Sequence, residues 1–147
     1  MYAEENKGLS RKPMNISHLA HINYSTIKDS LDKASVVRDD ASYWQSDGKL
    51  PHYIDFNFDR KVKIKKVMLL VDWQQDETYS PSEISVSIGN DAHDLQEAFL
   101  KILHVIPEEQ WIVMDLDVIV SAFNIRIHFN SNFGDGKDVR IVQVKLI

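Results

Sequence analysis

Residues 53–59 read Tyr-Ile-Asp-Phe-Asn-Phe-Asp, and from the second position onward apolar and polar side chains alternate. In an extended chain Ile54, Phe56 and Phe58 then share one face, and the polar side chains between them share the other. A period of two is typical of a β-strand with one face in the core and the other in solvent. This stretch predicts a protein built from β-sheet.

Further stretches of the same kind follow along the chain. Residues 67–71, Val-Met-Leu-Leu-Val, are apolar on both faces, which indicates a central strand covered on both sides. Residues 82–89 and 123–129 alternate again, and Ser85 and Ser87 are predicted to face outward. Together with shorter stretches this gives roughly eight strands with turn residues about every 8–12 positions, the signature of an antiparallel β-sandwich or jelly roll. The predicted fold class is therefore all-β.

The less regular segments allow four further predictions. Residues 29–37 are expected to form one or two helical turns, and residues 60–61, Arg-Lys, to form a turn. Segment 93–105 fits both a helical stripe and a strand, and we expect a helical turn at its start and a strand from about Phe99. Residues 139–147 are expected to close the fold as a single strand.

Length and composition limit the class of protein. The chain has 147 residues, enough for one domain with a sizeable core, and we expect a flexible tail over residues 1–13 and the domain over residues 14–147. The net charge of −5 argues against a nucleic-acid-binding surface, and no apolar run approaches the ~20 residues of a membrane span. No cysteine is present, which excludes disulfides and indicates an intracellular, reducing compartment.

No catalytic motif is found in the sequence. Its six histidines lack the HExxH or HxH spacing of zinc sites, and there is no GxSxG elbow, Walker loop or GxGxxG turn. The acidic pairs Asp39-Asp40 and Asp76-Glu77 have the groups for acid–base work or Ca²⁺ binding, or they are solvated loop acids. We therefore predict no enzymatic activity, no cofactor and no metal site.

Three polar loops, residues 38–52, 72–82 and 130–140, connect the predicted strands. The first contains Asp-Asp-Ala-Ser-Tyr-Trp-Gln-Ser-Asp-Gly-Lys-Leu-Pro-His at residues 39–52, which combines acids, aromatics and turn residues. Loops at one end of a jelly roll are able to form one surface, and such loops often carry function. Segment 72–83 has four acids and no base, which suits a cationic or extended peptide partner.

The aromatic residues divide between core and loops. Trp44 and Trp111 are expected in the core, because large aromatics dominate packing. Trp73 and Tyr79 lie at or after a strand end beside acids and are the better candidates for an exposed ligand platform.

The order of these motifs resembles the DOC-domain family of the anaphase-promoting complex, a cullin–RING-type ubiquitin ligase. The resemblance covers roughly residues 14 to 147. It is carried by Asp39-Asp40, Tyr43-Trp44-Gln45-Ser46-Asp47-Gly48, Pro51-His52, Asp76-Glu77-Thr78-Tyr79-Ser80-Pro81-Ser82, Ile84-Ser85-Val86, Gly89, Asp94-Leu95-Gln96-Glu97, Trp111 and Asp135-Gly136-Lys137-Asp138.

The resemblance implies a galactose-binding-like jelly roll and a non-catalytic role. Members of the family help a WD40 coactivator hold the destruction-box degron of substrates, and they contact scaffold and tetratricopeptide-repeat subunits of the complex in the nucleus and cytoplasm. No cofactor, metal, nucleic acid or membrane is implied. The positions that match the family's ligand-binding loops are Ser46, Asp47, Gly48, His52, Asp76, Glu77, Tyr79, Ser80, Pro81, Asn130, Gly136 and Asp138.

Two departures from the family pattern stand out. Arg140 and Val142 occupy the places where the family usually has His and Arg. Family members also commonly continue past the last strand to an Ile-Arg ending, whereas this sequence stops at Lys145-Leu146-Ile147. We expect either that the tail lies outside this sequence or that the jelly-roll body alone anchors the subunit.

Two other functions compete with degron binding. A carbohydrate-binding jelly roll would use Trp73 or Tyr79 as its stacking platform. A hydrolase using Asp47 or Asp76 with His52 has no supporting motif. Two substitutions follow from the sequence: alanine at Asp76 and Glu77 together is expected to leave the fold intact, and Trp111→Ala to destabilise it by about 3–5 kcal/mol.

Overall fold

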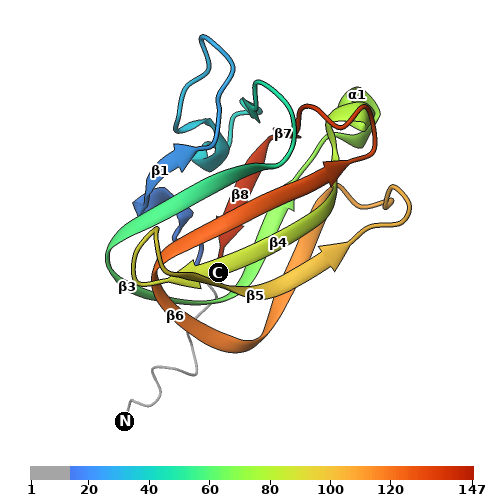
Figure 1. Cartoon of the computed structure of the whole chain (residues 1–147). Coiled ribbons are helices and arrows are strands. Elements are labelled where there is room, and N and C mark those ends of the chain that lie inside the picture. The colour runs from blue at the N-terminus through green and yellow to red at the C-terminus, as the bar shows by residue number, and fades with distance from the viewer. Residues whose placement is uncertain (1–13) are drawn as a thin grey trace.

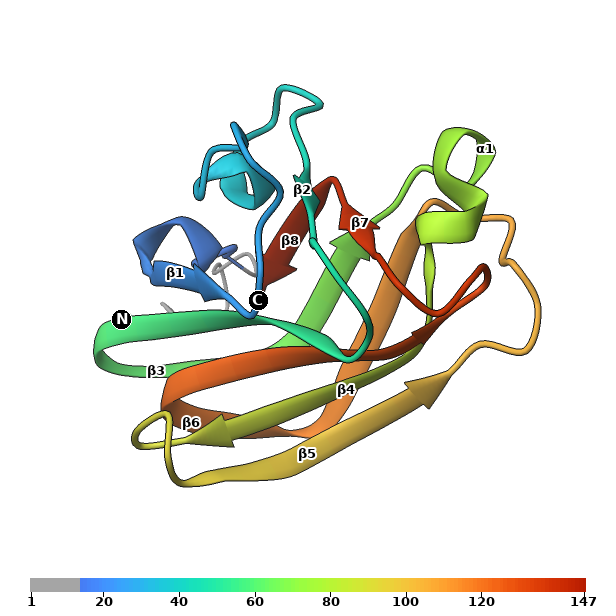
Figure 2. The ribbon, with the colours of Figure 1, turned by 45° about the horizontal axis from the view of Figure 1, so that its top comes forward.

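The computed structural model describes residues 14–147, and the tail expected over residues 1–13 lies outside them. Two long strands, β3 (His52–Leu70) and β6 (Trp111–Asn132), organise the fold. They pair antiparallel along most of their length, from Ile54 opposite Ile127 to Leu69 opposite Ile112. Both strands bend midway and fold back, so each contributes to two layers (Figures 1 and 2).

The two layers form an antiparallel sandwich. The larger layer has the order β1-β3-β6-β4-β5, with β1 (His21–Tyr24), β4 (Pro81–Gly89) and β5 (Leu95–Ile102) beside the first half of β3 and the second half of β6. The other layer joins the second half of β3 to the first half of β6 and to β8 (Gln143–Leu146). A separate pair, β2 (Trp44–Gln45) with β7 (Arg140–Ile141), lies over one end.

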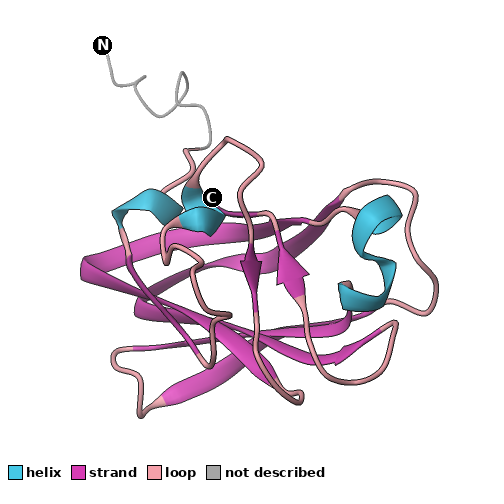
Figure 3. Ribbon diagram, turned by 90° about the horizontal axis from the view of Figure 1, so that it is seen from above, coloured by secondary structure: helices cyan, strands magenta, loops and turns pink. Residues whose placement is uncertain are grey.

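Helical structure is confined to short turns at the edges of the sandwich (Figure 3). These turns are η2 (Ser17–Leu19), η3 (Ser35–Val37), α1 (Trp73–Asp76) and η4 (Glu77–Tyr79). The α1 turn begins where the Asp72 carboxylate accepts a hydrogen bond from the Gln75 backbone N–H at 3.2 Å. Within residues 14–147 every helix is too short to cross a membrane.

The core lies between the layers and is almost entirely apolar. Ile54, Phe56 and Ile127 from the larger layer and Val67 and Leu69 from the other are all fully buried, as their alternation predicts. The predicted all-β, antiparallel fold class is therefore confirmed. The run at 67–71 is a central strand, because β3 has β6 on one side and β8 on the other there.

Trp44 anchors one end of this core. Its ring is fully buried, stacks on Tyr24 at 5.0 Å between centroids, and contacts Phe129 at 5.8 Å. Its indole N–H donates to the Thr26 carbonyl at 2.9 Å, which satisfies the one polar group that burial would otherwise leave unpaired.

Several local predictions were wrong. Residues 60–61 bend without interrupting β3, because register shifts in the β3–β6 ladder absorb the change of direction that was assigned to a turn. The segment from residue 93 has no helix: after a turn, β5 begins at Leu95 and pairs with β4, and tertiary pairing overrides the helical stripe. The final strand is split into β7 and β8. By contrast, the one or two helical turns predicted in residues 29–37 are present as a single turn, η3.

Burial also corrects four side-chain assignments. Ser85 and Ser87 lie opposite His128 and Arg126 on the outer face of β4, yet both are buried, and the Ser87 hydroxyl is 3.1 Å from His128 Nε2. Trp111 is only half-buried at the start of β6, with the Lys145 ammonium 4.8 Å from its ring. Trp73, expected at the surface, is buried and donates its indole N–H to the Glu109 carbonyl at 2.7 Å.

Candidate functional site

The three polar loops lie at one end of the sandwich, next to β2, β7 and α1 (Figure 2). We call residues 46–50, 72–81 and 130–140 together the rim. The first and third loops are joined through Asp138, whose Oδ1 accepts hydrogen bonds from the Ser46 hydroxyl at 2.9 Å and the Gly48 backbone N–H at 3.0 Å. One carboxylate thus fixes the distance between two loops that are about ninety residues apart in sequence.

The second and third loops are in direct backbone contact. The Phe133 N–H donates to the Ser80 carbonyl at 3.0 Å, and the Ser80 hydroxyl donates to the Asp76 carbonyl at 2.8 Å. Gly134 approaches Thr78 so closely that a Cβ there would lie 2.4 Å from the Thr78 carbonyl oxygen. Only glycine allows this approach, so the two loops are packed together.

The His52 side chain links the first loop to the third. Its Nε2 lies 3.1 Å from the Gly48 carbonyl and 2.9 Å from the Lys137 carbonyl, while Nδ1 faces the Ser25 and Thr26 hydroxyls at 3.3 Å. Carbonyls only accept, so Nε2 carries the proton and Nδ1 accepts from a hydroxyl. The ring is 2% exposed and therefore serves as a bridge between loops.

Arg140 connects the second and third loops through its side chain. Its guanidinium donates to the Asp76 carboxylate at 2.5 Å and to the Gln45 side-chain oxygen through Nε at 3.0 Å and Nη2 at 2.5 Å. It also lies 4.7 Å from the ring centroids of both Tyr43 and Tyr79, in cation–π range of two aromatic side chains. The planar guanidinium group of Arg140 is therefore held by hydrogen bonds in its plane and by its contacts with two aromatic rings.

The electrostatics of Asp76 reflect two opposing effects. Burial raises the pKa of its carboxyl group, because the charged form loses water. The nearby Arg140 guanidinium lowers that pKa, and the Asp72 carboxylate adds a smaller upward contribution. Burial is the largest of these, so the net shift is upward even though the ion pair forms.

The twelve positions selected from the sequence separate into two groups in the structure. One group is buried and holds the loops, and its members are Ser46, His52, Asp76, Ser80 and Pro81. The other group is less buried: Asp47, Gly48, Glu77, Asn130 and Gly136 are exposed, while the half-buried Asp138 and Tyr79 also belong to the framework through Ser46 and Arg140. The three loops meet in one surface, but the sequence did not separate its framework from its exposed edge.

The exposed part of the rim is polar and mixed in charge. Asp47, Glu77 and Asp135 supply exposed carboxylates, and Lys49 and Lys137 supply exposed ammonium groups. Backbone groups of the glycines add further donors and acceptors. Such a surface is suited to an extended polar chain that alternates donors and acceptors, as a peptide backbone does. Within residues 14–147 no three His, Cys, Asp or Glu side chains gather as metal ligands do.

Sequence reasoning missed the residues that complete the cluster around Arg140. Arg140 stood out only as a departure from the family pattern, and nothing local marks Tyr43 or Gln45 as its partners. The structure identifies Gln45 as a partner because the two-residue pairing of β2 with β7 places it directly opposite Arg140. A pairing that short has no sequence periodicity.

Solved structures with a similar fold define the class of protein. A CBM32 module of Clostridium perfringens, solved in complex with GalNAc-β-1,3-galactose, superposes with a TM-score of 0.77 over 91% of this chain and 99% of its own, at 8% identity. A chitosan-binding module of a Paenibacillus chitosanase/glucanase gives 0.73 over 92% and 99%, at 14% identity. At these identities the likeness shows the fold alone: the chain is a jelly roll of the galactose-binding-like class.

Comparison of sequences shows the family within that class. The family model described as "Anaphase-promoting complex, subunit 10 (APC10)" matches residues 1–147. The chain belongs to this family. Anaphase-promoting complex subunit 10 of Homo sapiens is 36% identical over 116 residues, which cover 75% of this chain and 62% of the relative. Subunit DOC1 of Saccharomyces cerevisiae is 29% identical over 145 residues, covering 93% and 57%. The chain thus spans less than two thirds of these relatives' length.

Proposed function

We propose that this chain is a non-catalytic subunit of the anaphase-promoting complex that holds destruction-box degrons together with a WD40 coactivator. Membership of the family supports the place in the complex. The observation that carries the binding role is the rim, a rigid polar surface made by three loops and cross-linked by Asp138, His52 and Arg140. As a subunit of that ligase, the chain would act in the nucleus and cytoplasm beside scaffold and tetratricopeptide-repeat subunits.

The exposed acids of the rim are assigned to the degron. Asp47 and Glu77 lie on different loops and are both exposed, so they are free to accept hydrogen bonds from a peptide backbone or a cationic side chain. Each contact is weak in water. A weak contact suffices when the coactivator holds the same peptide, because the second contact is then effectively intramolecular.

The test uses the double variant Asp47→Ala/Glu77→Ala in the reconstituted complex. Asp76 is left intact because it is buried. We expect normal incorporation and shorter ubiquitin chains on a destruction-box substrate, with no change on a substrate whose destruction box has been mutated. The matched control, Asp94→Ala/Asp117→Ala, removes the same charge from exposed positions away from the rim and is expected to behave as wild type. Equal chain lengths for both double variants would refute the assignment.

A carbohydrate ligand is the second candidate, since one module of the same fold was solved with a disaccharide bound. The two aromatic platforms expected for it are poorly placed: Trp73 is buried, and the ring of Tyr79 packs against Arg140. A glycan-array screen separates the candidates, because selective binding of a glycan that is lost in Asp47→Ala/Glu77→Ala would favour carbohydrate over degron.

A further inference from the structure

A second surface lies at the other end of the sandwich, where β3 bends. Residues 60–66 read Arg-Lys-Val-Lys-Ile-Lys-Lys, which places five cations in seven positions of a chain whose net charge is −5. We call Arg60, Lys61, Lys63, Lys65 and Lys66 the basal patch. Neither the core nor the rim uses these charges.

The basal patch is displayed by the strand geometry. Lys61, Lys63 and Lys65 are all exposed at the bend. A register shift in the β3–β6 ladder between Ile64 and Lys66 breaks the regular alternation there, and Lys65 and Lys66 both border the same cavity as Lys63. No ion pair between described residues involves any of the lysines, whereas the adjacent Asp59 is within 3.0 Å of His21. One described carboxylate, Asp115 on β6 opposite Lys66, borders the same cavity, so three lysines there face a single acid and the surface keeps a positive charge.

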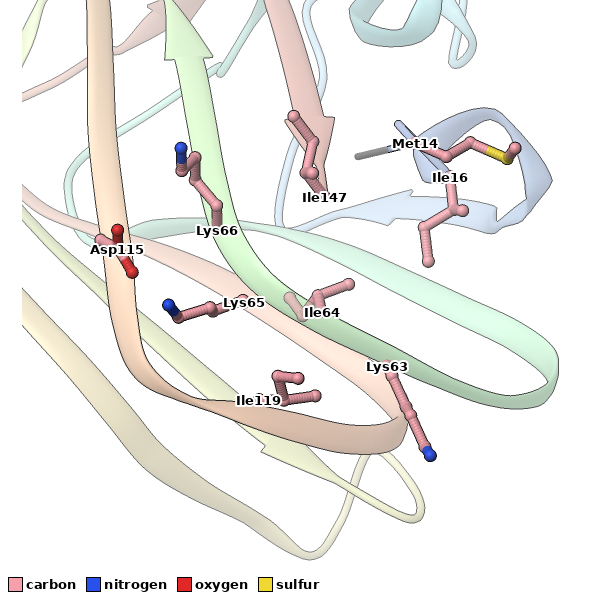
Figure 4. A pocket seen from close by; sticks show the side chains of 9 residues that line it. All are labelled: Met14, Ile16, Lys63, Ile64, Lys65, Lys66, Asp115, Ile119 and Ile147. Carbon is pink, nitrogen blue, oxygen red and sulfur yellow. The ribbon is translucent and has the colours of Figure 1, made fainter. Parts of the chain in front are cut away.

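An apolar cavity of about 470 Å³ lies against this patch. Figure 4 shows Lys63 and Lys65 projecting from β3 on either side of Ile64, with Ile119 facing them from the bend of β6. Met14, Ile16 and Ile147 complete the apolar lining, and Ile119 is 65% exposed. Lysine stems and isoleucines together form a surface that is apolar in its middle and cationic at its edge.

We propose that the basal patch and this cavity form a docking site for an acidic segment of a partner protein that carries apolar side chains. The acids would pair with the lysines, and the apolar side chains would enter the cavity between Ile64 and Ile119. A nucleic acid fits less well, because a protein of net charge −5 repels a long polyanion and no aromatic side chain lines the cavity for base stacking.

This docking site is compatible with an occupied rim. β3 begins at His52 under the rim and reaches the bend at Arg60, a distance of about 25 Å at ~3.3 Å per residue. β4 spans the same interval, from Pro81 at the rim to Gly89 at the far end. A partner at the base and a ligand at the rim therefore do not compete, and the inference is independent of which ligand the rim binds.

The first experiment measures binding of a fluorescein-labelled acidic peptide containing two leucines to the full chain. We expect saturable binding that weakens at least about tenfold in Lys61→Glu/Lys63→Glu/Lys65→Glu, because three attractive pairs become repulsive. The binding should also fall steeply toward ~1 M salt, where the Debye length is about 3 Å. Polyglutamate of equal charge and a DNA duplex serve as comparison ligands. Equal or tighter binding of either would overturn the proposal of an apolar, acidic protein segment.

The second experiment places the same variant in the reconstituted complex. Its matched control is Lys28→Glu/Lys33→Glu/Lys101→Glu, with the same charge change at exposed or half-exposed lysines outside both the basal patch and the rim. We expect reduced co-purification for the basal variant only, with unchanged melting of the isolated chain. Restored degron-dependent chain extension at high subunit concentration would separate a docking defect from a rim defect. Equal incorporation of both variants, or peptide binding that requires residues 1–13 to be removed first, would refute the docking site.

Discussion

Replacing Asp76 by alanine tests whether the Arg140 ion pair holds the rim together. Asp76 is 6% exposed, and its carboxylate is in contact with a guanidinium whose side chain is 21% exposed. The substitution leaves Arg140 between Tyr43 and Tyr79 with Gln45 as its remaining side-chain acceptor. A cation in that position has lost most of its water and its only described counter-charge.

The size of the effect follows from the exposure of Arg140. Removing one partner of a fully buried pair costs about 3–5 kcal/mol, because the other charge stays buried and uncompensated. Arg140 retains about a fifth of its side-chain surface and its bonds to Gln45, so we expect Asp76→Ala to cost about 2–3 kcal/mol. Glu77→Ala, one residue away and exposed, is the matched control and should cost under ~0.5 kcal/mol.

The assay is urea unfolding of the isolated chain, followed by tryptophan fluorescence, for Asp76→Ala, Arg140→Ala and the double variant. With equal m-values the midpoints convert directly to free energies of unfolding. The double-mutant cycle should give a coupling energy of about 1.5–3 kcal/mol, as for hydrogen bonds between charged groups. A cost for Asp76→Ala equal to that of Glu77→Ala, or a coupling energy near zero, would show that the pair does not hold the loops.

Two further predictions concern the core and pH. Trp44→Ala should cost about 3–5 kcal/mol, while Trp111→Ala should cost only about 1–2 kcal/mol because the Trp111 ring keeps part of its surface in water beside Lys145; similar unfolding midpoints for both variants would contradict this. Burial, helped by Arg126, lowers the pKa of His128 in the folded chain, so the unfolded chain binds a proton at this residue more tightly. The contribution of His128 to stability is therefore complete above the ordinary pKa near 6.5 and is lost as pH falls through the lower folded value. His128→Gln should flatten the dependence of the unfolding free energy on pH between these two values.

The fold could be predicted from sequence where period and burial agree. The alternation at 53–59 and 123–129 predicted a strand in each stretch, and the structure pairs the two strands with the buried Ile54 opposite the buried Ile127. The predictions failed where long-range pairing decides the outcome. Residues 60–61 carry charges typical of a turn, yet pairing with β6 on both sides of the bend keeps the strand continuous. Leu95 starts a strand because β4 offers it a partner.

The candidate site could be located but not resolved from sequence. Polar loop residues indicate where a site lies, since loops at the end of a sandwich carry function. They do not reveal which side chains face the ligand, because a loop with few apolar residues must be held by buried hydrogen bonds of its own. Ser46 and His52 are residue types that often bind ligands, but here their side chains hydrogen-bond to Asp138 and to the Lys137 carbonyl. Because Asp76 is buried, we expect its replacement by alanine to lower the free energy of unfolding, contrary to the prediction from sequence.

If the rim binds a degron as we propose, its buried half contributes by holding the three loops in place. A shared peptide that gains only weak contacts from each receptor cannot also supply the free energy to order the loops that touch it. In this chain that ordering is built in: Asp138 fixes the first loop to the third, and Arg140 fixes the second to the third. Loosening either link would therefore weaken ligand capture even though Asp47 and Glu77 remain in place, and the loss would appear as a lower affinity with an unchanged set of contacts. Under the proposed function, the affinity of the rim for a degron would therefore depend on its framework as much as on its exposed acids.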